Sequence, residues 1–157
     1  MGQDMIHIAN ALQAILDGAV PRLRAMSQKH VMHDRGAGKW NVKEILGHLI
    51  DSAANNQQRF VRARTADPLV FPNYDQNAWV DALGYRTRPW LELVDIWAAY
   101  NAQIAQIISS TPVARRSVRC LIGDAEAVTL EALMEDYVRH TEHHLAQILP
   151  VETRARV

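Results

Sequence analysis

Cysteine is nearly absent from this sequence, which contains Cys120 and no other. A single thiol cannot form an internal disulfide, and this favours a reducing, cytoplasmic setting. The first residues, MGQDMIHIANAL, lack the basic start and the long apolar stretch of a secretory signal peptide. No apolar run approaches the roughly 18 residues that a membrane span requires. We therefore expect a cytoplasmic protein that does not insert into a membrane.

Net charge is also missing, because 17 basic residues balance 17 acidic ones. Without a basic excess, nothing favours binding to nucleic acid or to an anionic membrane surface. The 157 residues contain no internal repeat, low-complexity tract or linker. Since 48% of the residues are hydrophobic, the chain can bury a sizeable core. We expect residues 1–157 to form one domain.

Helical periodicity is abundant. Apolar residues recur at spacings of three and four over four segments, at about 4–26, 41–64, 89–110 and 130–149. Asn41, with Glu44 three residues later, predicts a capping box at the start of the second helix. Pro89 is predicted to be the first residue of the third helix, and Pro150 to stop the fourth. Pro21 is predicted to kink or divide the first helix.

The segments between these helices contain shorter elements. Residues 65–88 form a long connection between the second and third helices, with one short helix at about 75–82. Before the fourth helix, RRSVRCLIGDAEAVTL predicts a short hairpin that turns at Gly123 and Asp124. The whole pattern predicts an all-α fold, a four-helix bundle. The long connection permits a crossover between non-adjacent helices, so a simple up-and-down topology is not required.

Histidines gather in the fourth helix, in the stretch RHTEHHLAQI. His140 and His144 are four residues apart on the apolar stripe, whereas His143 falls near its rim. His48 lies on the inward stripe of the second helix. A bundle can bring His48, His140 and His144 together in its interior, where three imidazoles would bind a metal ion and leave a coordination position open. The alternative is that they are hydrogen-bonded core residues.

Known metal-protease motifs are excluded by the residues between these histidines. A zincin requires His-Glu-x-x-His, but position 141 is threonine. The inverted motif requires glutamate at 143, where this chain has histidine. Glu142 points to solvent and cannot act as the general base of either scheme. No Gly-x-Ser-x-Gly motif is present, and Cys120, between apolar neighbours, is predicted to be inert.

Two neighbours of the histidines are candidate functional residues. Asp51, one turn after His48, is predicted either to orient an imidazole or bind substrate, or to be a surface carboxylate. Gln147 shares a helix face with His140 and is predicted to support the ligands from behind. The arginines of QQRFVRAR indicate a solvated helix end that complements the helix dipole, with binding of an acidic substrate or thiol as the alternative.

The long connection offers a second group of candidates in the segment FPNYDQNAWV. Tyr74, Asp75, Asn77 and Trp79 are predicted either to line the mouth of a site or to pack the connection against the bundle. For Trp79 we favour structural packing. A connection of this length in a compact domain is usually functional or packed over another part of the molecule.

Three segments resemble one known family. KWNVKEILGHLIDSA resembles the second-helix signature of the DinB-like superfamily, FPNYDQNAWV resembles its mid-chain motif, and RHTEHHLAQI is similar to its fourth-helix signature. The segments come in the family's order and span nearly the whole chain. The resemblance implies a four-helix bundle, usually a homodimer, that holds a divalent metal on three histidines. These carry over as His48, His140 and His144, with zinc and nickel as candidate metals.

The resemblance also implies several activities. Relatives in the family include thiol S-transferases that use bacillithiol or mycothiol, a mycothiol-dependent maleylpyruvate isomerase, and members described as metal-dependent hydrolases. Our leading hypothesis is a metal-dependent S-transferase that joins a low-molecular-weight thiol to a small-molecule electrophile. The alternatives are a metal-dependent hydrolase, with Asp51 or Asp75 moving protons, and a non-catalytic metal-binding or stress-response protein.

A homodimer is expected from the resemblance, and the second helix carries one further hint. Ile50, Phe60 and Val61 add apolar residues beyond a single inward stripe. Such a surplus indicates either an interface or a wide core face.

Overall fold

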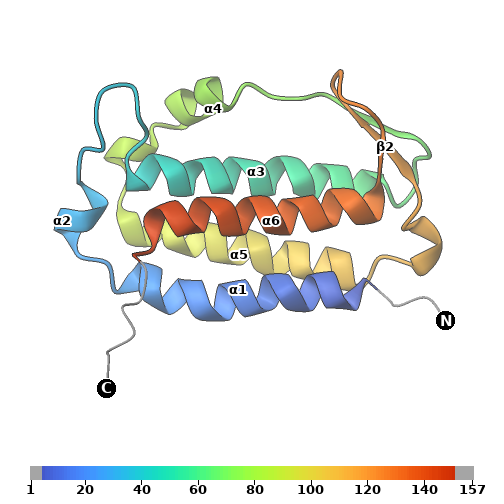
Figure 1. Ribbon diagram of the computed structural model, residues 1–157, viewed down its shortest axis with the longest axis horizontal. Coiled ribbons are helices and arrows are strands. Elements are labelled where there is room, and N and C mark those ends of the chain that lie inside the picture. Colours follow the sequence, from blue (N-terminus) through green and yellow to red (C-terminus); the bar gives the residue numbers. More distant parts are fainter. Residues whose placement is uncertain (1–4, 151–157) are drawn as a thin grey trace.

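Four long helices make up most of residues 5–150, the part of the chain that the computed structural model describes (Figure 1). They are α1 (Ile6–Arg24), α3 (Val42–Arg62), α5 (Trp90–Ser109) and α6 (Leu130–Ile148). The predicted four-helix bundle is therefore present, and each helix ends within about two residues of its predicted bounds. The predicted start of the first helix at residue 4 lies outside the described residues.

Local chemistry at the helix ends explains these bounds. The side chain of Asn41 accepts a hydrogen bond from the Glu44 backbone at 3.0 Å, and Glu44 accepts one from the Asn41 backbone at 2.9 Å. This is the predicted capping box. Pro89 is the residue before α5 and not its first helical residue. Pro21 lies inside α1, which continues to Arg24, so it does not divide the helix.

The helices run in pairs of opposite direction. Figure 1 shows α3 and α5 running one way, and α1 and α6 the other. Helices α1 and α3 each pack against both α5 and α6, so consecutive α1 and α3 lie diagonally across the bundle. Helices α5 and α6 are diagonal in the same way, so the segments between α1 and α3 and between α5 and α6 both join non-adjacent helices. The long connection joins the neighbours α3 and α5, so the crossover that its length permits is not made there, and the topology is not a simple up-and-down one.

The length of the α3–α5 connection follows from their parallel orientation. A 21-residue helix is about 30 Å long, so the chain must return over that distance before α5 can begin. The return segment contains strand β1 (Leu69–Phe71), helix α4 (Gln76–Leu83) and the 3₁₀ helix η1 (Tyr85–Thr87). It passes over the outer face of α3 (Figure 1). As a result, most of α3 is buried, including many of its polar residues.

A three-stranded sheet lies at the end of the bundle where α3 ends. Strands β2 (Arg119–Ile122) and β3 (Val128–Thr129) form the predicted antiparallel hairpin. Gly123 has a φ of 55° at the turn, a left-handed conformation that suits glycine. Strand β1, which was not predicted, pairs in parallel with β2. Cys120 is buried in β2, and burial raises the pKa of its thiol, in agreement with the prediction of an inert cysteine.

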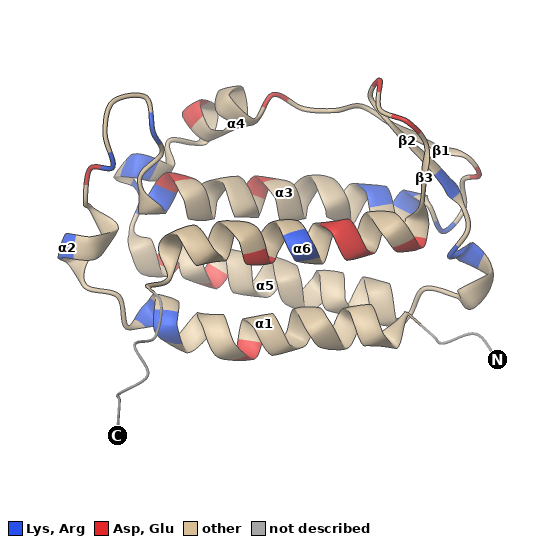
Figure 2. Cartoon of the chain, in the orientation of Figure 1, with Lys and Arg blue, Asp and Glu red and all other residues tan. Residues whose placement is uncertain are grey.

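The remaining elements are short, and the core is apolar. Helix α2 (Gln28–Val31) precedes α3, and the 3₁₀ helix η2 (Val113–Arg115) precedes the sheet. Ile50 and Phe60 are buried in the core of the monomer, so they do not form the surplus surface that hinted at an interface, whereas Val61 is exposed. None of the described helices combines the length and the hydropathy needed to cross a membrane. Basic and acidic residues are interspersed over the elements in the view of Figure 2.

Candidate metal centre and adjoining cavity

The three histidines singled out from the sequence meet between α3 and α6. Ligand nitrogens of His48, His140 and His144 all lie within 4.8 Å of one another. The Nε2 atoms of His48 and His140 are 3.2 Å apart. The ring of His144 is centred 4.8 Å from that of His48 and 4.6 Å from that of His140. His143 is exposed, as its position on the helix predicted.

Burial keeps two of these imidazoles neutral. His48 has no exposed surface, and burial together with the neighbouring His140 and His144 lowers its pKa to about 4. Burial and the neighbouring His144 likewise lower the pKa of His140 to about 4. A neutral imidazole has the free lone pair that a metal ion needs, so both are in the ligand form at neutral pH.

The donor set fits a divalent transition metal. In a tetrahedral zinc site, with Zn–N distances near 2.05 Å, ligand nitrogens are about 3.3 Å apart. The 3.2 Å between the Nε2 atoms of His48 and His140 matches this spacing, and a ligand nitrogen of His144 lies within 4.8 Å of both side chains' ligand nitrogens. Nδ1 of His144 is 3.1 Å from Oε1 of Gln147. If Nδ1–H donates to this oxygen, Nε2 is left free to bind an ion, as expected for the supporting role predicted for Gln147.

Asp51 is neither the surface carboxylate nor the partner of an imidazole that were among its predicted alternatives, and its binding of substrate stays a prediction. It is 1% exposed, so it is not a surface carboxylate. Its Oδ1 accepts a 2.6 Å hydrogen bond from the Tyr85 hydroxyl, and its Oδ2 is buried without a hydrogen-bond partner. Burial raises its pKa to about 6, and the bond from Tyr85 opposes that shift. Its hydrogen-bond partner is thus a tyrosine from the return segment and not an imidazole.

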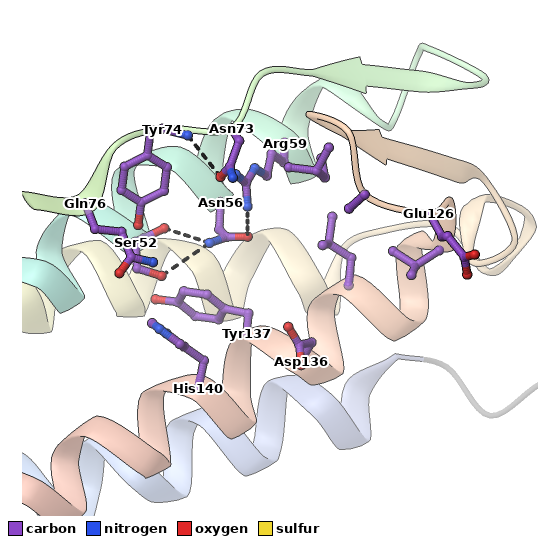
Figure 3. A pocket seen from close by; sticks show the side chains of 14 residues that line it. Ser52, Asn56, Arg59, Asn73, Tyr74, Gln76, Glu126, Asp136, Tyr137 and His140 are labelled. Carbon is purple, nitrogen blue, oxygen red and sulfur yellow. Dashed lines mark hydrogen bonds between the residues drawn. The ribbon is translucent and has the colours of Figure 1, made fainter. Parts of the chain in front are cut away.

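A cavity of about 340 Å³ adjoins the histidines (Figure 3). His140 and Tyr137 line it from α6, Ser52, Asn56 and Arg59 from α3, and further residues from the return segment and the β2–β3 hairpin. Three of the α3 residues are linked along the helix. Asn56 donates to the Ser52 carbonyl at 2.8 Å, and Arg59 Nη1 donates to Asn56 Oδ1 at 3.5 Å. The candidate metal centre therefore adjoins, through His140, a chamber lined mainly by polar residues.

Arg59 corrects one sequence interpretation. The arginines near the end of α3 were expected to be solvated, and Arg62 is indeed exposed. Arg59 is only 7% exposed, and burial lowers the pKa of its guanidinium group. The guanidinium lies over the Phe71 ring at 5.6 Å, a cation–π contact. No sequence signal near Arg59 separates it from its solvated neighbour Arg62, since the aromatic ring that it contacts, Phe71, belongs to the separate element β1.

The connection residues divide between two roles. Tyr74 is half-buried and lines the cavity, where burial raises the pKa of its hydroxyl. Trp79 contacts the Tyr74 ring at 5.3 Å, in keeping with the packing role favoured for it. Asp75 caps α4, because its Oδ1 accepts from the Ala78 backbone at 3.0 Å.

Asn77 does not reach the cavity beside the histidines. It is exposed and lines a separate hollow with Trp40, Glu44 and Arg86. Trp40, which the sequence did not single out, also packs its ring 5.0 Å from that of His48. Its position just before the Asn41 cap was the available signal, because a residue there lies little more than two turns before His48.

Comparison with known proteins agrees with this architecture. The family model of the DinB superfamily matches residues 11–148. YfiT of Bacillus subtilis, named as a proposed metal-dependent hydrolase, is 27% identical over 118 residues, which are 74% of this chain and 66% of that protein. A protein of Halalkalibacterium halodurans with the same designation, BH0277, is 26% identical over 111 residues, 69% of this chain and 63% of its own length. The match thus spans about two thirds or less of the length of these relatives.

A solved structure shares the fold. The structure of Bacillus subtilis YfiT, described as having an unusual four-helix-bundle topology, superposes with a TM-score of 0.74 at 24% identity. The match covers 92% of this chain and 81% of that one. The diagonal placement of consecutive helices described above is therefore found in a protein related to this chain only distantly in sequence.

Proposed function

The chain belongs to the DinB superfamily, and on that premise we propose that it is a metal-dependent S-transferase that joins a low-molecular-weight thiol to a small electrophile. His48, His140 and His144 would hold the ion, and zinc and nickel are the proposed metals. One observation carries most of the weight: His140, one of the three clustered imidazoles, lines a cavity whose wall consists mainly of polar residues. A purely structural metal site needs no such access.

The chemistry divides between the ion and the chain. A divalent ion held by these histidines supplies Lewis acidity, which lowers the pKa of a thiol and favours the nucleophilic thiolate. Ser52, Asn56 and Tyr74 offer hydrogen-bonding groups to a polar ligand in the cavity. The return segment covers this face of α3 and reduces the access of water. Gln147 would fix the orientation of His144 by accepting a hydrogen bond from its Nδ1–H.

The partners are part of the proposal. A polar cavity of about 340 Å³ suits a small polar thiol or part of one, and the resemblance to thiol S-transferases makes bacillithiol and mycothiol the proposed thiols. A homodimer is proposed on the same resemblance, and the buried positions of Ile50 and Phe60 lend it no support.

Hydrolysis is the second candidate, favoured by the names of the relatives YfiT and BH0277. It requires a group that accepts a proton from water. Asp75 is committed to capping α4, and Asp51 is buried against Tyr85. Asp136 lines the cavity one turn before His140 and is the better-placed carboxylate.

Metal content is the first test. Protein purified without a histidine tag should contain about one transition-metal ion per chain by mass spectrometry. His144→Ala should lose the ion, and His143→Ala, the same change on the exposed neighbour, should keep it. Wild-type protein without metal, even after incubation with zinc, nickel, manganese and iron, would refute the proposal.

Turnover then separates the candidate activities. The loaded protein should consume a thiol in the presence of an electrophile such as monobromobimane faster than the His144→Ala variant does. If the loaded protein cleaves members of a panel of esters and amides and consumes no thiol, the proposed activity becomes hydrolysis in place of thiol transfer. Stoichiometric metal that raises the melting temperature without either activity would assign the non-catalytic role.

A further inference from the structure

Arg59 has hydrogen-bond donors that the protein does not use. Its Nη1 donates to Asn56, while Nε and Nη2 are buried and have no hydrogen-bond partner. A buried donor without a partner costs about 1–3 kcal/mol, and more when the group is charged. Nearly all such groups in folded proteins are paired, so an unpaired pair of donors on one side chain points to a missing ligand.

The two free nitrogens form one edge of the guanidinium group. Nε–H and Nη2–H point in the same direction, and their spacing matches the two oxygens of a carboxylate, which a bidentate pair of hydrogen bonds engages. On the other edge Nη1 donates to Asn56, and the Arg59 Cζ lies 5.6 Å from the centroid of the Phe71 ring. These contacts fix the orientation of the fork before any ligand arrives, which lowers the cost of binding.

The protein offers Arg59 no anion of its own among the described residues. None of their ion pairs includes Arg59. Two carboxylates, Glu126 and Asp136, line the same cavity, but both side chains are exposed, and Asp136 is 3.4 Å from Arg139. In Figure 3 the guanidinium group projects from α3 toward Asn56 and the chamber, and both carboxylates lie on the far side.

The position of Arg59 relative to the histidines sets the size of the ligand. Arg59 and His48 are 11 residues apart on α3, about 16 Å along the helix axis. Helical side chains lean toward the N-terminus, so the guanidinium group approaches the histidines. Ser52 and Asn56 lie between them on the same face, and His140 lines the same cavity. One elongated small molecule can therefore reach both ends.

We infer that the cavity holds a carboxylate-bearing small molecule whose carboxylate binds the free Nε–Nη2 edge of Arg59 while its reactive end lies at the histidines. The inference rests on the proposed function, because it names the charge of the thiol or electrophile that function would use. It also assigns a specificity role to Arg59, since neutral analogues leave the buried cation unpaired.

The test uses metal-free protein, so that its outcome is independent of metal binding and turnover. Nitrogen-15 NMR follows the Nε–H signal of Arg59, identified by its absence in Arg59→Lys. Acetate should shift this signal saturably, and acetamide, the uncharged isostere, should not. The Nε–H signal of Arg62, one turn away and exposed, serves as the internal control and should respond to acetate no more than to sodium chloride.

The possible outcomes each decide the inference. A signal that moves equally with acetate and with sodium chloride would overturn it, and so would saturation by inorganic phosphate at a lower concentration than by acetate, which would assign a phosphate group instead. In the loaded enzyme, Arg59→Lys should raise KM at least tenfold for a carboxylate thiol but not for its amide analogue. Saturable acetate binding in a chain that binds no metal would uphold this subsite while refuting the proposed function.

Discussion

Two groups of buried polar residues lie inside the bundle, and they differ in how completely their hydrogen bonds are formed. The first, the closed network, consists of Asn101, Tyr137 and Thr141. The Tyr137 hydroxyl donates to Asn101 Oδ1 at 2.5 Å, Asn101 Nδ2 donates to the Trp97 carbonyl at 2.9 Å, and Thr141 donates to the Tyr137 carbonyl at 2.9 Å. Every buried polar atom of these three side chains has a partner.

The second group, the open row, consists of His48, Asp51 and Arg59 on α3. Each has at least one buried polar atom without a hydrogen-bond partner. These atoms are Nδ1 of His48, Oδ2 of Asp51, and Nε and Nη2 of Arg59. A satisfied network stabilises the fold, whereas unsatisfied atoms cost stability unless something outside the chain satisfies them. Trp97 Nε1 and Gln57 Oε1 are also buried without a partner, so what distinguishes the open row is that three charged or ionisable side chains of one helix share this property.

The largest expected effect comes from removing one imidazole of the candidate metal centre. His140→Ala leaves two ligands, so metal affinity should fall by far more than the roughly 100-fold that follows loss of a supporting partner. Competition with a chelator of known affinity measures the change. His143→Ala is the matched control, and equal losses in the two variants would contradict the assignment of the ligands.

A second prediction uses pH to separate Asp51 from the closed network. Its pKa is about 6 in the fold against an ordinary 3.8, so between these values the folded state binds more protons than the unfolded state. Stability due to Asp51 is therefore lost as pH rises from about 4 to 6, by up to about 3 kcal/mol. In metal-free protein, the stability of Asp51→Asn relative to wild type should increase over that range.

Urea unfolding of both proteins across this pH range measures the effect. Histidine titration contributes equally to the two proteins and cancels in the difference. A difference that stays constant with pH would mean that Asp51 has an ordinary pKa.

The closed network makes the opposite prediction. Tyr137→Phe keeps the ring contact with Phe60 but leaves Asn101 Oδ1 buried and unpaired. The free energy of unfolding should fall by about 1–3 kcal/mol, and metal affinity should not change. Tyr100→Phe, at a half-buried tyrosine on α5, is the control and should have little effect. Reduced metal affinity in Tyr137→Phe would place the closed network in the site.

The smallest expected effect concerns the residue that supports His144. Gln147→Ala removes the oxygen that lies 3.1 Å from His144 Nδ1. Because Gln147 is exposed, metal affinity should fall by about tenfold, the lower end of what such partners contribute. Gln147→Glu should restore it, since a carboxylate accepts the same hydrogen bond. Unchanged affinity in Gln147→Ala would show that this contact does not orient the imidazole.

Much of the fold and of the candidate metal centre could be predicted from the sequence, because the signals lie close together along the chain. Helical spacing placed His140 and His144 on one face, and Asn41 with Glu44 marked the start of the helix that carries His48. The turn at Gly123 was visible in the chain itself. Each of these signals depends on residues within a few positions of one another.

The missed features depend on partners distant in the sequence. Asp51 is paired with Tyr85, 34 residues later, and no pattern near Asp51 indicates that. Strand β1 is three residues long and pairs with β2 about 50 residues later, so periodicity could not reveal it. Arg59 was taken for a solvated residue because the chain that covers it is that same strand. The buried atoms without hydrogen-bond partners, which distinguish the open row, can be recognised only once the chain is folded.

The return segment between α3 and α5 has a consequence for how such a protein can diverge. The histidines are fixed on two packed helices, but Asn73, Tyr74 and Gln76, which wall the adjoining cavity, come from the segment that passes over them. Substitutions and length changes are better tolerated in a surface connection than in a helix core. A lineage can therefore acquire new ligands by altering this one segment while its metal chemistry stays inherited and unchanged.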